Sequence, residues 1–453
     1  MTDERVDVVV LGLGVGGEEV AGKLAEAGLS VVGIDDGLVG GECPYWGCIP
    51  SKMMIRAANA LAEARRVDDL AGAATVTPDW APVARRIREE ATDNWNDEVA
   101  IRRFTDKGGR FVRGRGTLAG PGRVRVGADT YHAGRAVVVG TGTAPSVPPI
   151  DGLAGTPYWT NREAIECAEL PGSLVILGAG AIGLELAQVF ARFGVQVRII
   201  EAYDRVLAIE EPEASEVVAA ALRADGVQIH TSARAERVSH GDDGFTVHLA
   251  GGERVRGERL LVATGRSARL GDLGIDAVGL DPHQRFLAPD ERMRVGDRLW
   301  AVGDVTGQGA FTHVAMYQAG IAVRDILGED GPGADYRALS RVTFTDPEVG
   351  AVGLTERQAR EKGIEVRTAN SPLPSSTRGW IHKAGNEGFV KLIADAERGT
   401  IVGATSVGPA GGEVLGWLSV AVHAEVPVEK LRHMIYAYPT FHRAIEDALR
   451  RLG

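Results

Sequence analysis

The sequence has little of several features that mark other classes of protein. Only three of its 453 residues are cysteine, too few for a framework of structural disulfides, which favours a reducing compartment. No stretch approaches the roughly 18 uncharged apolar residues of a membrane span. The acidic start, Met1 to Arg5, runs straight into a strand pattern and leaves no room for a signal peptide. We therefore expect a cytoplasmic protein without a membrane partner.

Long runs of positive charge are missing as well. The net charge is −11, and the basic segments at 85–88 and 450–451 are short enough to be solvated helix faces. These features argue against a nucleic-acid partner. The hydrophobic share of 44% and the charged share of 25% are typical of a globular protein. Glycine is abundant, with 60 residues, which predicts many tight turns and close backbone approaches.

Strand, glycine turn, helix and strand follow one another near the start of the chain. An apolar segment at 6–11 precedes a glycine-rich turn at 12–17, a helical pattern runs to Ala27, and a second apolar segment leads to Asp35. This order predicts a βαβ unit with a parallel sheet. The same succession returns at 174–201, so we predict two such units in one chain.

The three glycines of each unit have separate tasks. The first permits the tight turn, the second lets a pyrophosphate approach the backbone, and the third lets helix and strand pack closely. The N-terminus of the helix then faces the phosphates. An acid about twenty residues later would accept hydrogen bonds from ribose hydroxyls. The predicted positions are Gly12, Gly14, Gly17 and Asp35 in the first unit and Gly178, Gly180, Gly183 and Glu201 in the second.

The second acid bears on the choice of nicotinamide cofactor. Glu201 would place a like charge beside the 2′-phosphate of NADPH, and no arginine follows it directly. We therefore expect NADH. NADPH stays an alternative, because Arg198 and Arg205 lie close to Glu201 in the sequence.

Two of the three cysteines lie together, ahead of a charged, helical stretch that we expect over about 52–104. Cys43 and Cys48 are five residues apart, a spacing that suits one turn of irregular helix and brings the side chains within disulfide range. No neighbouring Cys or His supplies further metal ligands, so we expect no bound metal. The pair is interpreted as a redox-active dithiol. Cys167 is isolated and is expected to be a small buried residue.

These motifs together resemble those of the pyridine nucleotide–disulfide oxidoreductases, the family of dihydrolipoamide dehydrogenase, glutathione reductase and mercuric reductase. The similarity extends over essentially the whole chain, and its parts follow one another in the family's order. The first part is the Cys-x4-Cys-Ile-Pro-Ser-Lys motif at 43–52. The further parts are Thr141-Gly142, Ala263-Thr264-Gly265-Arg266, 301–305, 344–350, 401–404 and Gly408-Pro409.

The resemblance implies an order of domains. An FAD-binding domain would take residues 1–150 and again 269–334, and an NAD(P)-binding domain would take residues 151–268. A C-terminal α+β dimerisation domain would take residues 335–453. The predicted fold class is therefore α/β, with two Rossmann-like dinucleotide-binding domains, for FAD and NAD(P), and the dimerisation domain. The resemblance also implies FAD as cofactor and a homodimer.

Roles for individual residues are likewise implied by the resemblance. Cys48 would face the flavin, and Cys43 would be the sulfur that meets the substrate. Lys52 would lie beside flavin N5, paired with Glu185, where a cation stabilises negative charge on the reduced flavin. Asp304 would bind the ribityl chain. The remaining predicted cofactor contacts are Gly41, Thr141, Gly142, Gly265, Gly303 and Ala315.

The sequence departs from the family near its C-terminus. Dihydrolipoamide dehydrogenase and glutathione reductase carry a His-Pro and a Glu five residues after the His, whereas this chain has Tyr438-Pro439 and Arg443. In the family that histidine is the acid/base for the dithiol, and tyrosine, with an ordinary pKa of about 10, is a poor base at neutral pH. Tyr438 is therefore predicted as a catalytic hydrogen-bond donor, and dihydrolipoamide is not expected as the main substrate. His442 is interpreted as a polar residue of the terminal helix, with a substitute base as the alternative.

Two relatives with other activities share features of this sequence. Mercuric reductase also has tyrosine at the position of Tyr438, but it carries a C-terminal Cys-Cys pair that is not found in this sequence. The soluble transhydrogenase also has tryptophan at the position of Trp46, but it lacks the second cysteine, present here as Cys48. The bulky Tyr45 and Trp46 either narrow the access of substrate to the dithiol or simply pack.

The predicted function is electron transfer from NAD(P)H through FAD and the Cys43–Cys48 pair to a small-molecule acceptor. The acceptor would be a reactive disulfide, a quinone-like compound or, as in mercuric reductase, a soft metal ion. The alternative is a pyridine nucleotide transhydrogenase or quinone reductase (a diaphorase) in which the cysteines are secondary. A component of a lipoyl complex and a redox-sensing binding protein are two further hypotheses.

Overall fold

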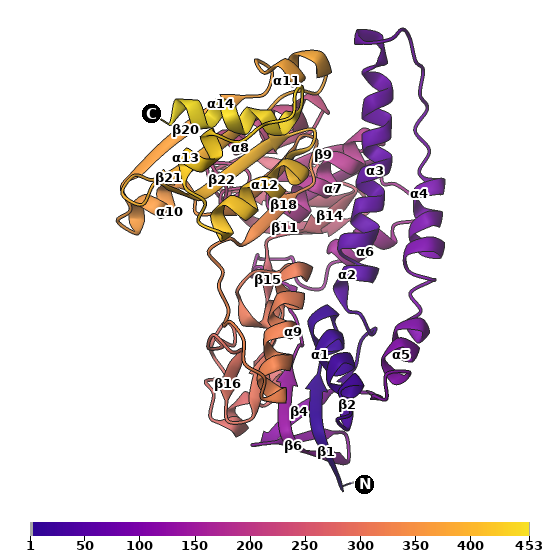
Figure 1. Cartoon of the computed structure of the whole chain (residues 1–453). Coiled ribbons are helices and arrows are strands. Elements are labelled where there is room, and N and C mark those ends of the chain that lie inside the picture. Colours follow the sequence, from indigo (N-terminus) through magenta and orange to yellow (C-terminus); the bar gives the residue numbers. More distant parts are fainter. Residues whose placement is uncertain (1–2, 453) are drawn as a thin grey trace. The chain divides into compact units, whose positions relative to one another are not determined.

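A computed structural model describes residues 3–452 of the chain, and the chain divides into two units that it enters more than once (Figure 1). Each unit has its own sheets and is described by itself. The first unit consists of residues 1–50, 85–146 and 266–335. The second unit consists of residues 51–84, 147–265 and 336–453.

The first unit is built on an eight-stranded sheet. Its strands and the helices that cover it are β1 (Asp3–Leu11), α1 (Val15–Glu26), β2 (Val31–Asp35), α5 (Glu98–Thr105), β3 (Arg110–Arg113), β4 (Gly116–Gly120), β5 (Arg123–Val126), β6 (Asp129–Val139), β16 (Arg294–Gly296), β17 (Leu299–Ala301) and α9 (Thr312–Leu327). The order β17-β6-β1-β2-β3 is parallel throughout, whereas β5 pairs antiparallel with β4 and β6. Parallel neighbours need a crossover connection, and α1 supplies it between β1 and β2.

The second half of strand β1, Val8 to Leu11, is buried on both faces, which explains its unbroken apolar sequence. Val8 and Val10 lie in a core shared with α1, α5 and α9, while Val9 and Leu11 lie in a second core with residues of β4 and β5. Alternate side chains of a strand point to opposite faces, so a strand covered on both sides carries hydrophobic residues at every position. The glycine turn at 12–17 therefore follows the buried end of a strand.

The second unit contains a smaller parallel sheet with the order β10-β9-β8-β14. The elements of this part are β8 (Ser173–Leu177), α7 (Ala181–Arg192), β9 (Gln196–Ile200), α8 (Pro212–Ala224), β10 (Gln228–His230) and β14 (Arg259–Val262), with the antiparallel strands β11 (Ala235–Gly241), β12 (Gly244–Leu249) and β13 (Arg254–Gly257). Helix α3 (Cys48–Arg65) begins in the first unit and continues in this one. The β8-α7-β9 crossover repeats the arrangement of β1, α1 and β2.

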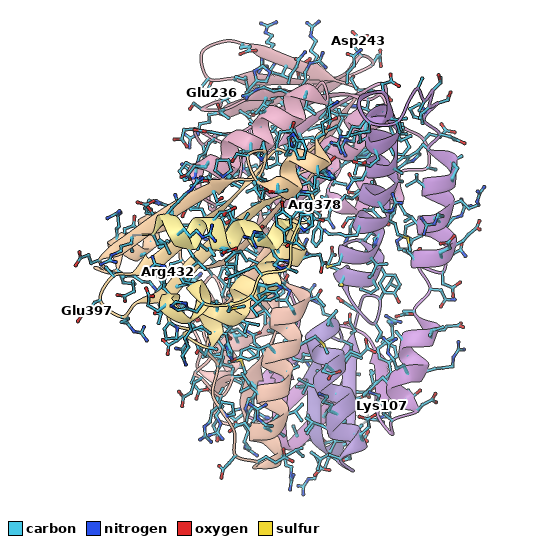
Figure 2. All side chains as sticks on the ribbon, turned by 45° about the horizontal axis from the view of Figure 1, so that its top comes forward. Lys107, Glu236, Asp243, Arg378, Glu397 and Arg432 are labelled. Atoms are coloured by element: carbon cyan, nitrogen blue, oxygen red, sulfur yellow. The ribbon has the colours of Figure 1, made fainter. Side chains whose placement is uncertain are left out.

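The C-terminal part of the second unit is a five-stranded antiparallel sheet with helices. Its elements are β18 (Ser340–Thr343), β19 (Glu348–Gly353), α10 (Glu356–Glu361), β20 (Val366–Pro372), α11 (Thr377–His382), β21 (Phe389–Asp395), β22 (Thr400–Gly408), α12 (Gly411–His423), α13 (Val428–Arg432) and α14 (Ala444–Arg451). Apolar side chains of α12 and α14 pack against those of β21 and β22. Charged side chains such as Arg378, Glu397 and Arg432 lie on the outside (Figure 2).

The structure confirms the predicted α/β fold class, both βαβ units and the α+β character of the last segment. The single helical stretch expected over 52–104 is wrong. Helix α3 ends at Arg65, and α-helix resumes only in α4 (Ala81–Arg86), since Gly72 and Pro78 interrupt a helical backbone. The domain boundaries assigned by ligand stay a prediction. No helix among residues 3–452 is long and apolar enough to cross a membrane.

Candidate active site

The first glycine turn is closed by its own acid. Gly12 has φ +85°, and a methyl group on it would lie 2.6 Å from the carbonyl oxygen of Gly140, so only glycine fits there. A methyl group on Gly17 would lie 1.9 Å from the oxygen of Gly12, which is the close helix–strand contact that the motif predicts. Asp35 Oδ2 accepts a hydrogen bond from the backbone N–H of Leu13 at 2.6 Å. The carboxylate predicted to bind ribose thus also holds the turn.

The second glycine turn repeats this geometry in the second unit. Gly178 has φ +101°, and a methyl group on Gly183 would lie 2.4 Å from the oxygen of Gly178. Glu201 is 8% exposed. Its Oε2 accepts from the N–H of Ala179 at 2.6 Å and its Oε1 from the N–H of Tyr203 at 2.9 Å. Gly14 and Gly180, the second glycines, stand directly before α1 and α7.

The loops that face the two turns also correspond. A methyl group on Gly12 would lie 2.7 Å from Cα of Thr141, and one on Gly178 would lie 3.3 Å from Cα of Thr264. Each threonine is followed by a predicted contact glycine with positive φ, +63° at Gly142 and +119° at Gly265. The duplication therefore extends to the segment that packs against each glycine turn.

The cysteine pair lies against the first glycine turn, in the first unit. Gly40 donates its N–H to the oxygen of Leu13 at 2.7 Å, and a methyl group on Gly41 would lie 2.9 Å from Cα of Gly14. Cys43 lies in the short helix α2 (Glu42–Tyr45), and Cys48 is the first residue of α3. The sequence predicted one irregular helical turn holding both cysteines, but the structure places them in two separate helices with a break between them.

The two thiols have different surroundings. Cys43 is half-buried and Cys48 is exposed, with the Cys48 sulfur 3.5 Å from the hydroxyl oxygen of Thr312. A hydrogen bond with Cys48 is the main reason that the pKa of the Cys43 thiol is raised, and burial raises it further. A thiolate at Cys48 would also repel a second negative charge at Cys43.

A cavity of about 310 Å³ opens beside Cys43 within the first unit. Arg103 crosses part of it and donates to Glu18 at 2.6 Å, while Lys107, labelled in Figure 2, lies 3.3 Å from Glu26. A small molecule that reaches Cys43 by this route meets charges of both signs. The lining residues are Val15, Glu18, Glu19 and Gly22 of α1, Gly40, Cys43 and Pro44 of the cysteine loop, and Arg103, Phe104, Lys107 and Met316.

A half-buried polar group lies at Asp304, also in the first unit. Asp304 Oδ2 accepts from the hydroxyl of Thr143 at 2.9 Å, and Arg266 donates to that hydroxyl at 2.8 Å. Burial raises the pKa of Asp304, with the bond from Thr143 opposing it. The N–H of Gly303 donates to Gln318 Oε1 at 2.7 Å. The sequence did not predict Thr143 and Gln318 as site residues, since neither belongs to a recognisable local pattern.

The predicted FAD residues converge within the first unit. Ala315 is buried, and its Cβ lies within 3.6 Å of the positions that methyl groups on Gly303 and Gly16 would take. Glycine and alanine at these positions keep side-chain atoms out of the space beside the turn. Helix α1 begins at Gly14 without a side-chain cap, and Asp304 is a half-buried carboxyl group. This arrangement fits a dinucleotide that carries phosphates and hydroxyl groups.

Lys52 and Glu185 meet in the second unit. Lys52 Nζ donates to Glu185 Oε2 at 2.9 Å, and Glu185 is only 6% exposed. Glu185 Oε1 accepts from the N–H of Phe344 at 2.8 Å, while the Lys52 ammonium lies 4.6 Å from the centre of the Phe344 ring. The pair that the resemblance implies is thus close in space, and its role stays a prediction.

Tyr438 and Arg443 form a contact of a different kind from a His–Glu dyad. Tyr438 is 64% exposed, and the guanidinium carbon of Arg443 lies 5.3 Å from its ring centre. A cation over the face of a phenol is an attractive contact that leaves the hydroxyl group free to turn. His442, interpreted from the sequence as a polar residue of the terminal helix, lies in a 3₁₀ turn (Phe441–Arg443) directly before α14, and its ring stacks on Trp417 with ring centres 5.0 Å apart.

The other residues singled out in the sequence have structural surroundings. Cys167 is buried, its thiol donates to the oxygen of Glu169 at 2.7 Å, and burial raises its pKa to about 11. This confirms the prediction of a buried residue. Tyr45 is also buried, and it packs on Trp46. Among residues 3–452, no cluster of three His, Cys, Asp or Glu side chains suits a metal ion.

Comparison with known proteins identifies the class to which this site belongs. Residues 6–319 match the model of the family described as pyridine nucleotide-disulphide oxidoreductase, and residues 339–449 match the model of its dimerisation domain. The chain belongs to this family, whose members are flavoprotein oxidoreductases that use FAD and NAD(P)H. The resemblance stated from the sequence motifs is confirmed.

Individual relatives of the chain have more than one activity. This chain is 31% identical to a mercuric reductase of Bacillus cereus, over 98% of this chain and 71% of that protein. It is 32% identical to a dihydrolipoyl dehydrogenase of Halobacterium salinarum, over 98% of this chain and 95% of that protein. Both similarities cover nearly the whole of this chain, so overall sequence identity does not decide whether its substrate is a metal ion or a dithiol.

Solved structures give a similar picture. The HOCl-induced flavoprotein disulfide reductase RclA from Escherichia coli, in a Cu(II) complex, has a TM-score of 0.86 and 28% identity, with 98% of this chain and 99% of that chain covered. LpdA from Mycobacterium tuberculosis has a TM-score of 0.86 and 27% identity, with both chains fully covered. The fold is therefore that of flavoprotein disulfide reductases.

Proposed function

We propose that this chain is an FAD-dependent NAD(P)H:disulfide oxidoreductase that uses the Cys43–Cys48 pair. The observation that carries the proposal is the pair itself: two hydrogen-bonded thiols in a family of disulfide reductases, one of them lining a cavity. Bound FAD, held by the first glycine turn and Asp304, would supply two-electron exchange between a nicotinamide and the sulfurs. The roles of the protein residues follow from their protonation.

In the proposed exchange, the proton of the Cys43–Cys48 hydrogen bond lies on Cys48 when Cys43 attacks, as a thiolate, one sulfur of the substrate disulfide. The other substrate sulfur leaves and takes that proton, as a thiol. Cys48, now a thiolate, then attacks the Cys43 sulfur of the mixed disulfide, which releases the second substrate sulfur as a thiolate. The two cysteines end joined, and the substrate has gained two electrons. Because a tyrosine, Tyr438, stands in the place of the family's histidine and tyrosine is a poor base at neutral pH, we propose acceptors that need no proton removed from them.

Three further parts of the proposal concern partners and cofactor choice. We propose NADH, since Glu201 would repel the 2′-phosphate of NADPH and since Arg198 and Arg205 donate to the backbone oxygens of Arg256 and Ala208. We propose a homodimer, since the chain carries the family's dimerisation domain and exposes large apolar side chains there. The most exposed apolar side chains of this domain are Ile435, Trp380 and Val420. A cytoplasmic location is proposed because cysteine is scarce.

The test is a screen of purified protein for NADH and NADPH oxidation with lipoamide, small disulfides and quinones as acceptors. Cys43→Ser should abolish disulfide reduction and spare quinone reduction, and Cys167→Ala is the matched control because it removes the third, buried thiol. If Cys43→Ser leaves disulfide reduction unchanged, the proposal is wrong. Quinone or nicotinamide turnover without any disulfide reduction would favour the diaphorase or transhydrogenase alternative.

A second candidate function is reduction of a soft metal ion as substrate. Met316 lines the same cavity as Cys43, so a thioether and a thiol, both soft ligands, face one space. Similarity to mercuric reductases supports this candidate. Met316→Leu keeps the volume of the side chain and removes the sulfur. It should slow Hg(II)-dependent NADH oxidation several-fold and leave disulfide reduction unchanged; equal effects on both would contradict the metal role.

A further inference from the structure

Helices α3 and α7 are joined at two levels within the second unit. The first link is the bond from Lys52 to Glu185 at 2.9 Å. The second is the bond from Arg192 to Asn59 Oδ1 at 2.7 Å. The second link lies seven residues further along each helix, from Lys52 to Asn59 on α3 and from Glu185 to Arg192 on α7. The two helices therefore run side by side in the same direction. Seven residues are two helical turns, or roughly 10 Å.

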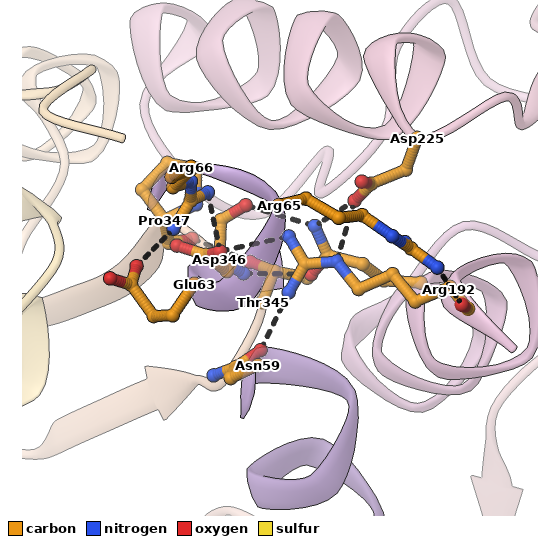
Figure 3. Close-up of polar contacts among 10 residues, drawn as sticks. Asn59, Glu63, Arg65, Arg66, Arg192, Asp225, Thr345, Asp346 and Pro347 are labelled. Carbon is orange, nitrogen blue, oxygen red and sulfur yellow. Dashed lines mark hydrogen bonds and ion pairs between the residues drawn. The ribbon is translucent and has the colours of Figure 1, made fainter. Parts of the chain in front are cut away.

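Arg192 lies deep in the unit, at 2% exposure. Its guanidinium donates to Asp225 Oδ2 at 2.9 Å and to Asp346 Oδ2 at 2.8 Å, besides the bond to Asn59 (Figure 3). Arg65 of α3 donates to the backbone oxygen of Arg192 at 2.9 Å. A planar guanidinium with a partner on each nitrogen has one orientation, so Arg192 is a rigid bridge between α7 and α3.

The same face of α7 also holds the segment that opens the C-terminal sheet. Asp346 N–H donates to Gln188 Oε1 at 2.7 Å, and Gln188 Nε2 donates back to the oxygen of Asp346 at 2.9 Å. Phe344 N–H donates to Glu185 Oε1 at 2.8 Å. Positions 185, 188 and 192 are spaced by three and four residues and therefore share one helix face. Glu185 is thus one end of a row whose other end is Arg192.

We propose that Arg192 is a positioning residue for the Lys52–Glu185 pair, which rests on the function proposed for that pair. Lys52 has a flexible stem and a side chain that is 34% exposed. Its ammonium contacts Glu185 of α7 and the ring of Phe344, whose N–H is itself bonded to Glu185. Glu185 is anchored on α7, and the distance from α3 to α7 decides where Lys52 meets it. Arg192 lies two helical turns from Glu185 and sets the distance between α3 and α7 through its contacts with Asn59, Arg65 and Asp346.

The first test compares Arg192→Gln with Arg341→Gln. Arg341, whose side chain is 16% exposed, forms an ion pair with the buried Glu210 at 2.7 Å in the same unit, so it is a control for the loss of an arginine that leaves a buried carboxylate unpaired. In the FAD-loaded protein, Arg192→Gln should move the two-electron midpoint potential of the flavin to a more negative value, as Lys52→Met does. Arg341→Gln should lower thermal stability without moving the potential. A potential unmoved by Arg192→Gln, while Lys52→Met moves it, would overturn the inference.

A second readout does not depend on bound flavin or on turnover. The rate of acetylation of Lys52, measured by mass spectrometry on the flavin-free protein, should rise several-fold in Arg192→Gln and stay unchanged in Arg341→Gln. If Arg192→Gln does not fold, Asn59→Ala removes the link to α3 without leaving a buried charge, and should raise the rate in the same direction. Unchanged labelling in the folded variant contradicts the inference.

Two further variants separate positioning from general stability. In a Lys52→Met background, Arg192→Gln should cause no additional change in potential, because the arginine acts through Lys52. Arg192→Lys, which keeps the charge, should restore part of the potential. An additive shift in the double variant would show that Arg192 acts by another route. Failure of disulfide reduction in the acceptor screen, with the labelling result intact, would reject the proposed function and leave the positioning role standing.

Discussion

Lys391 of β21 is a buried cation whose removal should have a large and calculable effect. It is 6% exposed, and its ammonium lies 2.8 Å from Glu211, 2.8 Å from Glu213 and 3.1 Å from Glu356. The side chains of Glu213 and Glu356 are 39% and 29% exposed, so water screens their charges. Glu211 is 2% exposed and would become a buried charge without its cation. We expect Lys391→Met to cost about 3 to 5 kcal/mol, nearly all of it through Glu211.

The assay is urea unfolding followed by far-ultraviolet circular dichroism, at several pH values. Burial lowers the pKa of Lys391, but its bonds to Glu211 and Glu213 raise it by more, so the net shift is upward. A lysine with a raised folded pKa contributes its full stabilisation below the unfolded pKa of about 10.4 and loses it as pH rises through the folded value. The difference between wild type and Lys391→Met should therefore be constant near neutral pH and shrink only in strong alkali.

Two variants make this prediction sharp. Glu211→Gln in the Lys391→Met background removes the orphaned charge and should return most of the lost stability. Arg360→Ala is the control, because it breaks an exposed pair with Glu356 on α10 and should cost less than about 1 kcal/mol. A loss in Lys391→Met no larger than that of the control would refute the reasoning.

Three further predictions use other parts of the chain. Burial raises the pKa of Asp304, so the folded state binds this proton more tightly than the unfolded state does. The free energy of unfolding therefore falls as pH rises from the unfolded pKa of Asp304 through its folded pKa. Asp304→Asn should make the flavin-free protein more stable to heat at pH 7 and should weaken FAD binding in a titration. Tyr438→His with Arg443→Glu should raise the kcat/KM for dihydrolipoamide by roughly 10²-fold, the ordinary contribution of a general base, and an unchanged value would mean that another base is missing. Iodoacetamide at pH 8 should label Cys48 well before Cys167 in peptide mapping, since Cys48 is exposed and burial raises the pKa of Cys167 to about 11; faster labelling of Cys167 would contradict its burial.

The two nucleotide-binding units could be predicted because their constraints are local. A tight turn with positive φ at Gly12 and a close contact at Gly17 each demand glycine, and the acid that closes the turn stands at the end of the next strand. Such requirements depend on a few consecutive residues, so they are visible in the sequence. The break in the helical stretch expected over 52–104 depends on the single residues Gly72 and Pro78, which interrupt an otherwise charged, helix-forming sequence.

The partners of the polar side chains were beyond the sequence. Cys48 and Thr312 are 264 residues apart, and Arg192 and Asp346 are 154 residues apart. No local pattern marks such pairs, because a hydrogen bond across the fold depends on where whole helices and strands come to lie. The proximity of Lys52 and Glu185 was expected only through family resemblance.

The sequence by itself determined the α/β class, the duplicated glycine turns, the cysteine pair and the exchange of His and Glu for Tyr438 and Arg443. These are properties of residue type and short spacing, and the chain carries them before it folds. Only the tertiary structure decided that the Asp35 and Glu201 carboxylates hold their own turns and that Arg192 bridges two helices. The physical reason is that burial, charge pairing and hydrogen-bond satisfaction depend on contacts between distant segments, which exist only in the packed molecule.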